Sequence, residues 1–248
     1  MKRIITIIFA TMLLGGCVVL DSHEKRPGDV AKVIWNATHS DIMRINEIFD
    51  YVSRIEQYIT AEKQNNGGDL SYYFPGSELR YENNILIIVT PTTYGTTYTT
   101  VVETDGRTLV EGGVWRITRG GGSHFALHLD ATKGEWIEAE FDTLGYHEST
   151  GEATLRIKFL DDEYNFCYDG SITMTDTDAS IEKPLHLNTV INSALHYYGG
   201  MRQITRGKLT ITCHDELYDT TEIVKVDYGN EQGAANLIYH GNSYYAYY

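Results

Sequence analysis

The sequence predicts a mainly β chain with one N-terminal helix, an α+β class in which antiparallel strands form a sandwich or a partly closed barrel. Three observations predict this class. A single long stretch early in the chain repeats its apolar residues at about 3.6 positions, and a period of about 2 dominates after Asp69. Turn residues then recur about every 8 to 12 positions, which is typical of all-β segments. Hydrophobic residues make up 42% of the 248 positions, enough for a packed core.

The first element, residues 1–16, has the layout of a signal peptide. Lys2 and Arg3 give it a positive start, and an apolar stretch of eleven residues follows. A helix that crosses about 30 Å of hydrocarbon needs roughly 20 apolar residues, so this stretch is too short for a permanent anchor. We therefore expect residues 1–16 to direct secretion and then to be removed.

The end of this segment carries a motif. Leu14, Gly15 and Gly16 precede Cys17, an order that resembles the lipobox of bacterial lipoproteins, the substrates of signal peptidase II. The resemblance covers the signal only. It implies cleavage before Cys17 and acylation of this cysteine, and several acyl chains on one residue anchor a protein stably at a membrane. The alternative is an ordinary cleaved signal with an incidental cysteine.

The residues behind the cysteine bear on location. Val18 stands where, in many Gram-negative systems, an aspartate retains a lipoprotein at the inner membrane, so the resemblance implies an outer-membrane protein. Some lipoproteins that reach the cell surface carry an acidic cluster at this point, whereas Asp21 and Glu24 are separated. The sequence therefore does not decide whether the protein lies on the periplasmic or the cell-surface face of the outer membrane.

A tether is predicted for residues 17–37. They show no sustained periodicity, and Pro27 with Gly28 is expected to break a helix.

An amphipathic helix is predicted over residues 38–66. Thr38 and Asp41 offer a capping box at its start. Apolar residues recur at spacings of three and four, as in a helix with one buried face. They are Ile42, Ile45, Ile48, Phe49, Val52, Ile55 and Ile59.

Residues 67–248 are predicted to form strands with one wet face, hence an antiparallel sheet. The clearest strands are 85–90, 98–103, 107–110, 125–130, 137–141, 153–159, 209–213 and 222–228. Turns of hairpins are expected at Asp105-Gly106, Asp169-Gly170 and Gly241-Asn242.

This β region contains a candidate internal repeat. Residues 112–120 match residues 199–207 at six of nine positions, 87 residues apart. A duplication would give two β units, at about 80–165 and 166–248, each too small to bury a core comfortably alone. Duplication and a chance match both stay open.

The charge balance limits the classes of partner. The chain has 34 acidic and 20 basic side chains, a net charge of −14, and no stretch holds more than two basic residues in a row. Such a chain repels a phosphate backbone, so nucleic acid is not an expected partner.

No metal site and no cofactor are predicted. His124 and His128 lie four positions apart on a strand, about 13 Å, so they cannot share one ion. His128 with Asp130 would need further ligands. The acidic stretches 161–163 and 175–178 lack the full ligand pattern of a calcium loop.

One enzymatic alternative remains. Glu135, Glu138 and Glu140 could supply the acid and base of a carboxylate-dependent hydrolase acting on glycans, which needs two carboxylates about 5 to 10 Å apart in a cleft. Ser123 beside His124 lacks the Gly-x-Ser-x-Gly elbow of a serine nucleophile. No catalytic signature is complete.

Tyrosine, with 19 residues, is the compositional oddity. Exposed tyrosines can stack on sugars or anchor a protein interface, although tyrosine also simply favours strands. The candidate ligand surface comprises Tyr72, Tyr73, Tyr197, Tyr198, Tyr244 and Tyr245.

Two cysteines remain once Cys17 is lipidated. Cys167 and Cys213 are candidates for a disulfide, because the compartment outside the inner membrane permits one. Their strand faces need not meet, so a pair of free thiols is the alternative.

The predicted layout is similar to that of β-rich lipoproteins of Gram-negative envelopes. We expect a noncatalytic binding or structural role at the membrane to which the lipid anchors the chain. The expected partner is a glycan or an envelope protein, and the glycan hydrolase is the competing class.

Overall fold

The structure, a computed structural model, describes residues 26–64, 71–92, 95–121, 123–146, 149–160, 165–176, 184–231 and 233–248. Helix α1 spans Pro27–Lys63, and a short 3-10 turn, η1, spans Ser71–Tyr73. The strands are β1 (Glu78–Glu82), β2 (Ile85–Pro91), β3 (Thr97–Thr104), β4 (Val114–Arg119), β5 (Phe125–Asp130), β6 (Ile137–Tyr146), β7 (Ser149–Phe159), β8 (Phe166–Asp176), β9 (Leu185–Tyr198), β10 (Gln203–Asp215), β11 (Thr220–Glu231), β12 (Ala234–Tyr239) and β13 (Asn242–Tyr247).

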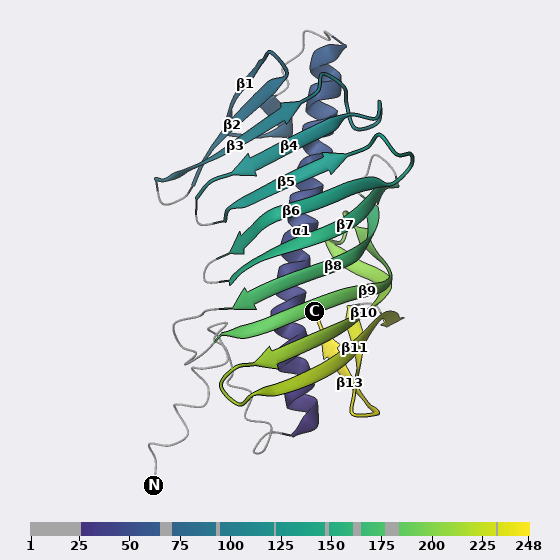
Figure 1. Cartoon of the computed structure of the whole chain (residues 1–248). Helices are drawn as coiled ribbons and strands as arrows, with labels where there is room; N and C mark the ends of the chain where they lie inside the picture. The colour runs from purple at the N-terminus through teal and green to yellow at the C-terminus, as the bar shows by residue number, and fades with distance from the viewer. Residues whose placement is uncertain are drawn as a thin grey trace.

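All of these strands belong to one antiparallel sheet. Each strand pairs with its neighbours in sequence, from β1 at one edge to β13 at the other (Figure 1). The predicted class, mainly β with one N-terminal helix, is confirmed. The sheet is not closed into a barrel, and the second layer of the fold is α1.

Helix α1 crosses the strands along the whole width of the sheet (Figure 1). Its 37 residues span about 55 Å. The 13 strands, at about 4.8 Å from one to the next, span about 58 Å. The helix is therefore as long as the sheet is wide. Within the described ranges, no helix combines the length and the apolar character needed to cross a membrane.

The predicted start of the helix at residue 38 is wrong. Pro27 occupies the first helical turn, where its missing N–H costs no hydrogen bond, so the residue that we expected to break a helix begins one. Residues 27–37 are thus helix rather than tether. Thr38 lies buried within α1, and its Oγ1 has no hydrogen-bond partner, so it does not cap the helix.

A single core lies between α1 and the inner face of the sheet. Alternate residues of each strand enter it, and along the helix mainly a narrow stripe stays exposed, for example at Lys32, Asn36 and Ser40. The sheet curls at its C-terminal end. This brings the Tyr248 hydroxyl close enough to donate a hydrogen bond of 2.7 Å to the Ile204 carbonyl at the start of β10. In a flat sheet, three strand spacings of about 4.8 Å would separate β10 from β13.

Two of the three predicted hairpin turns are wrong. Residues 107–110 belong to the connection between β3 and β4 rather than to a strand. Gly170 lies inside β8, where its φ of 132° accompanies a register shift against β9, a bulge rather than a turn. The turn at Gly241-Asn242 is confirmed, since β12 and β13 pair across it.

The two matching segments occupy similar places in the fold. Residues 112–120 lead into β4 and residues 199–207 into β10, and Ile117 and Ile204 both enter the core. The sheet continues from β7 to β8, where the boundary between two units was expected. Duplication stays a prediction, but the two segments share one sheet and one core.

Candidate functional site

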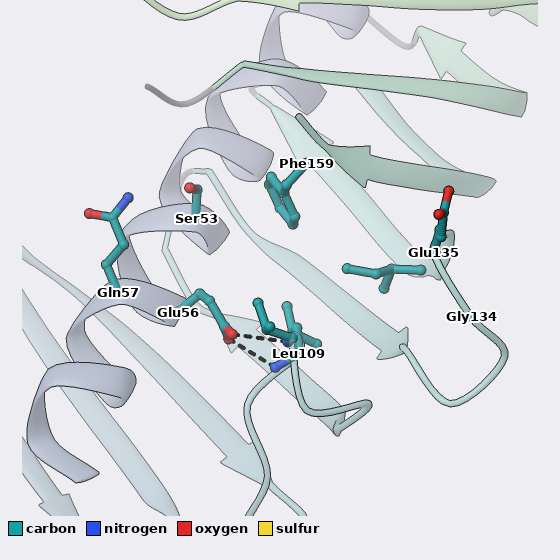
Figure 2. A pocket seen from close by; sticks show the side chains of 9 residues that line it. Ser53, Glu56, Gln57, Leu109, Gly134, Glu135 and Phe159 are labelled. Carbon is teal, nitrogen blue, oxygen red and sulfur yellow. Dashed lines mark hydrogen bonds between the residues drawn. The ribbon is translucent and has the colours of Figure 1, made fainter. Parts of the chain in front are cut away.

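A cleft of about 260 Å³ lies between α1 and one side edge of the sheet (Figure 2). The antiparallel strands follow one another in sequence order, so all connections that come after odd-numbered strands lie on the same side of the sheet. The β3–β4 connection, the β5–β6 connection and the end of β7 therefore line the cleft. The lining residues are Ser53, Glu56, Gln57, Leu109, Val110, Gly134, Glu135, Ile137 and Phe159.

Glu56 is the acidic group on the helix side of the cleft. Its Oε2 accepts a hydrogen bond from the Leu109 N–H at 3.0 Å, and its Oε1 accepts one from the Val110 N–H at 3.1 Å (Figure 2). Burial raises the pKa of Glu56, and the two N–H donors lower it without cancelling that effect. The side chain therefore holds the β3–β4 connection against the helix.

A second set of contacts fixes the same connection. The Lys63 ammonium donates hydrogen bonds to the Gly106 carbonyl at 2.6 Å and to the Glu111 carboxylate at 3.0 Å. The Thr108 N–H also donates to Glu111, and these donors lower the pKa of Glu111 to about 2. The cleft wall is thus tied to the end of α1 at two points.

The remaining walls are largely apolar. Leu109 and Ile137 are buried, and Phe159 is partly buried against the core. Val110 is 89% exposed, although its backbone N–H is held by Glu56. Val110 is thus an exposed aliphatic side chain at the rim of the cleft, held in place through its backbone.

The predicted carboxylates do not converge. Glu135 lines the cleft, but its carboxylate pairs with the Lys158 ammonium at 2.6 Å. Glu138 pairs with Lys133 at 2.7 Å. Glu138 and Glu140 point to the outer face, since the residues between and beside them on β6 are buried.

The histidines that were rejected as metal ligands in the sequence lie outside the cleft lining. His128 is exposed on the outer face, and Asp130 accepts hydrogen bonds from Thr132. In the part of the chain that the structure describes, no three His, Cys, Asp or Glu side chains could hold a metal ion. The acidic stretch 161–163 lies outside the described residues.

The six tyrosines of the predicted ligand surface divide between the two faces. Tyr197 is buried, and Tyr73 and Tyr244 pack against the core. The exposed members, on η1, β9 and β13, are Tyr72, Tyr198 and Tyr245. None of the nine residues that line the cleft is a tyrosine.

The candidate disulfide is contradicted, because Cys167 and Cys213 are free thiols. Strand β9 separates them: Cys167 lies opposite His196 and Cys213 opposite Leu187. These two β9 positions are nine residues, about 30 Å, apart. A disulfide requires Cα atoms within about 7 Å.

The lipobox residues Leu14, Gly15, Gly16 and Cys17 lie outside the described residues, so lipidation stays a prediction.

Sequence reasoning missed Glu56. The available signal was its place directly after Ile55, at the margin of the apolar helix stripe, where a carboxylate becomes partly buried. Its partner loop is 53 positions away, and no local pattern indicated the pairing.

Comparison with known proteins found no family model, no curated protein and no solved structure that matches the chain. The cleft itself is therefore the basis for a functional proposal.

Proposed function

We propose that this protein is a lipid-anchored protein of the bacterial outer membrane that binds an envelope polypeptide, without catalysis, at the cleft beside Glu56. The anchor rests on the motif from Leu14 to Cys17. The observation that carries the binding role is the cleft itself, whose walls at Leu109, Ile137 and Phe159 are apolar and whose rim exposes Val110.

The state of the two cleft carboxylates supports binding rather than hydrolysis. A glycosidase needs one carboxyl to donate a proton and a second to attack or to activate water. Here Glu56 uses both oxygens on backbone N–H groups, and Glu135 is paired with Lys158. Each carboxylate has a structural partner.

The size and lining of the cleft favour a polypeptide over a glycan. Its volume of about 260 Å³ lies below the range of roughly 300 to 1,000 Å³ for small-molecule sites, so it suits an apolar side chain of a larger partner. The lining lacks the tyrosines that would stack on sugar rings. Ser53 and Gln57 supply the polar groups on the helix side.

Photo-crosslinking in intact cells tests the binding site. A photoreactive residue at Gln57 should give one discrete adduct, and mass spectrometry should identify a polypeptide. Val110→Asp should reduce that adduct about tenfold or more, because a charge replaces the apolar rim. The matched control is Val190→Asp, also at an exposed valine but on the outer face of β9.

Three outcomes contradict the proposal. If no adduct forms, or if both aspartate variants give the same amount of adduct, the cleft is not the binding site. An adduct with the mass of a glycan would show that the ligand is a glycan and not a polypeptide. Release of reducing ends from envelope glycans by the wild type, lost in Glu135→Gln, supports the hydrolase instead.

The anchor has its own test. Mass spectrometry of the mature N-terminus should show acylated Cys17, and Cys17→Ala should move the protein out of the membrane fraction. An unacylated cysteine in the wild type overturns this part and leaves the cleft unaffected. Protease shaving of intact cells then separates the two faces of the membrane.

A further inference from the structure

The two edges of the sheet differ in how they resist association. An edge strand offers unpaired backbone groups to other strands, and proteins protect such edges with charged side chains. Strand β1 carries Glu78, Arg80 and Glu82. Strand β13 has no charged side chain and no proline, and among the described strands it pairs with β12 alone.

The outer face beside this unprotected edge carries several large apolar side chains. Tyr247 is 73% exposed, and Tyr245 precedes it on the same face. Ile238 of β12 lies opposite Ser243 and so diagonal to Tyr245, a separation at which large side chains meet. On β11, Ile223 is also exposed, and Lys225 lies opposite Ile238 on the same face.

The charge distribution indicates which partner this edge can accept. The chain carries a net charge of −14, so two copies repel each other over most of their surface. Its last 17 residues, 232–248, contain no Asp, Glu, Lys or Arg. On the neighbouring strands, Lys208 pairs with Asp227 at 2.8 Å, which neutralises both charges.

We propose that β13 is the interface with a second copy of this chain. The two β13 strands pair antiparallel across a twofold axis perpendicular to the sheet, which continues the sheet from one copy into the next. This axis keeps both outer faces on the same side, so Tyr245 and Tyr247 of each copy pack against those of the other. The hairpin of β12 and β13, which contains no Asp, Glu, Lys or Arg, is where two acidic chains approach with the least repulsion.

Sedimentation equilibrium of the purified full chain in detergent tests the association. The wild type should change from monomer to dimer over about 1 to 100 µM. Tyr247→Lys should raise the dissociation constant about tenfold or more, because it places two like charges at the interface. Tyr72→Lys is the matched control, since Tyr72 is 63% exposed but lies on η1, and it should leave the constant unchanged.

Cysteine crosslinking tests the geometry. Single substitutions Ser243→Cys, Tyr245→Cys and Tyr247→Cys should give a disulfide-linked dimer at the position nearest the axis. Arg80→Cys on β1 should give none. A monomer at every concentration, equal weakening by both lysine variants, or crosslinking through β1 would each overturn the proposal. Circular dichroism checks that every variant is folded.

Discussion

At the scale of single residues, Asp41 and His39 lie two positions apart on α1, and burial shifts their pKa values in opposite directions. Burial, with the charge of Asp176 as a smaller contribution, raises the pKa of Asp41 from 3.8 to about 7. Burial lowers the pKa of His39 from 6.5 to about 4. The His39 ring stacks on Trp35 at 4.7 Å, and its Nδ1 lies 3.2 Å from the Tyr228 hydroxyl.

The two shifts act on stability with opposite signs. The folded-state pKa of Asp41 is raised, so its contribution is fully present below about pH 3.8 and is lost as the pH rises to about 7. The folded-state pKa of His39 is lowered, so its contribution is present above about pH 6.5 and is lost as the pH falls to about 4. Between these limits the two contributions offset each other.

Single substitutions should therefore expose opposite slopes. In Asp41→Asn, the free energy of unfolding should fall more steeply than in the wild type as the pH drops from about 6.5 to about 4. In His39→Gln, it should fall more steeply as the pH rises through the same window. Each difference is on the order of a few kcal/mol. Urea unfolding at a series of pH values measures it, and curves parallel to that of the wild type would contradict the assignment.

At the scale of elements, the N-terminal turn of α1 depends on a close approach to β13. A Cβ added at Gly28 would lie 2.6 Å from the Tyr244 ring, closer than packed atoms tolerate. Gly28→Ala should thus destabilise the protein by about 1 to 3 kcal/mol, although alanine is the better helix former. In a Tyr244→Ala background, the same change should cost nothing. Urea unfolding of the four proteins checks this, and equal costs in both backgrounds would refute the contact.

The register of β9 leads to a prediction about thiols. Because β9 keeps Cys167 and Cys213 apart, reducing agent should not change the unfolding midpoint. A disulfide across a loop of this size would contribute about 4 kcal/mol, and its reduction would lower the midpoint by several degrees. Burial raises the pKa of Cys213 to about 12, so this thiol should react with thiol reagents only after unfolding. A midpoint that depends on reductant would contradict the observed register.

At the scale of the whole molecule, α1 connects both ends of the sheet in one core, so we expect a single unfolding transition. Trp35 on α1 contacts the β11–β13 end, and Trp115 lies on β4. Two variants that each keep one of them as the sole tryptophan report on the two ends. In each variant, fluorescence and far-UV circular dichroism should give the same urea midpoint. Separate midpoints would indicate independent units at 80–165 and 166–248.

Local patterns predicted most elements and few of their partners. The alternation of buried and exposed residues located β5, β7 and β11, because one wet face leaves a period of two in the sequence. Gly170 was misread as a turn, since an isolated glycine is compatible with both a turn and a bulge. The cleft was not predicted, because Glu56 and Leu109 meet only after α1 lies across the sheet.

The sequence by itself determined the class of the fold, the antiparallel pairing and the inward face of many strands, because these follow from apolar periods within short windows. It also carries the lipobox resemblance, which no fold is needed to recognise. Only the tertiary structure decided the length of α1, the separation of the two cysteines, which tyrosines are buried and which are exposed, and where the cleft lies. Each of these depends on which distant segments become neighbours, and the 37 residues of α1 match the width of the 13 strands that it packs against.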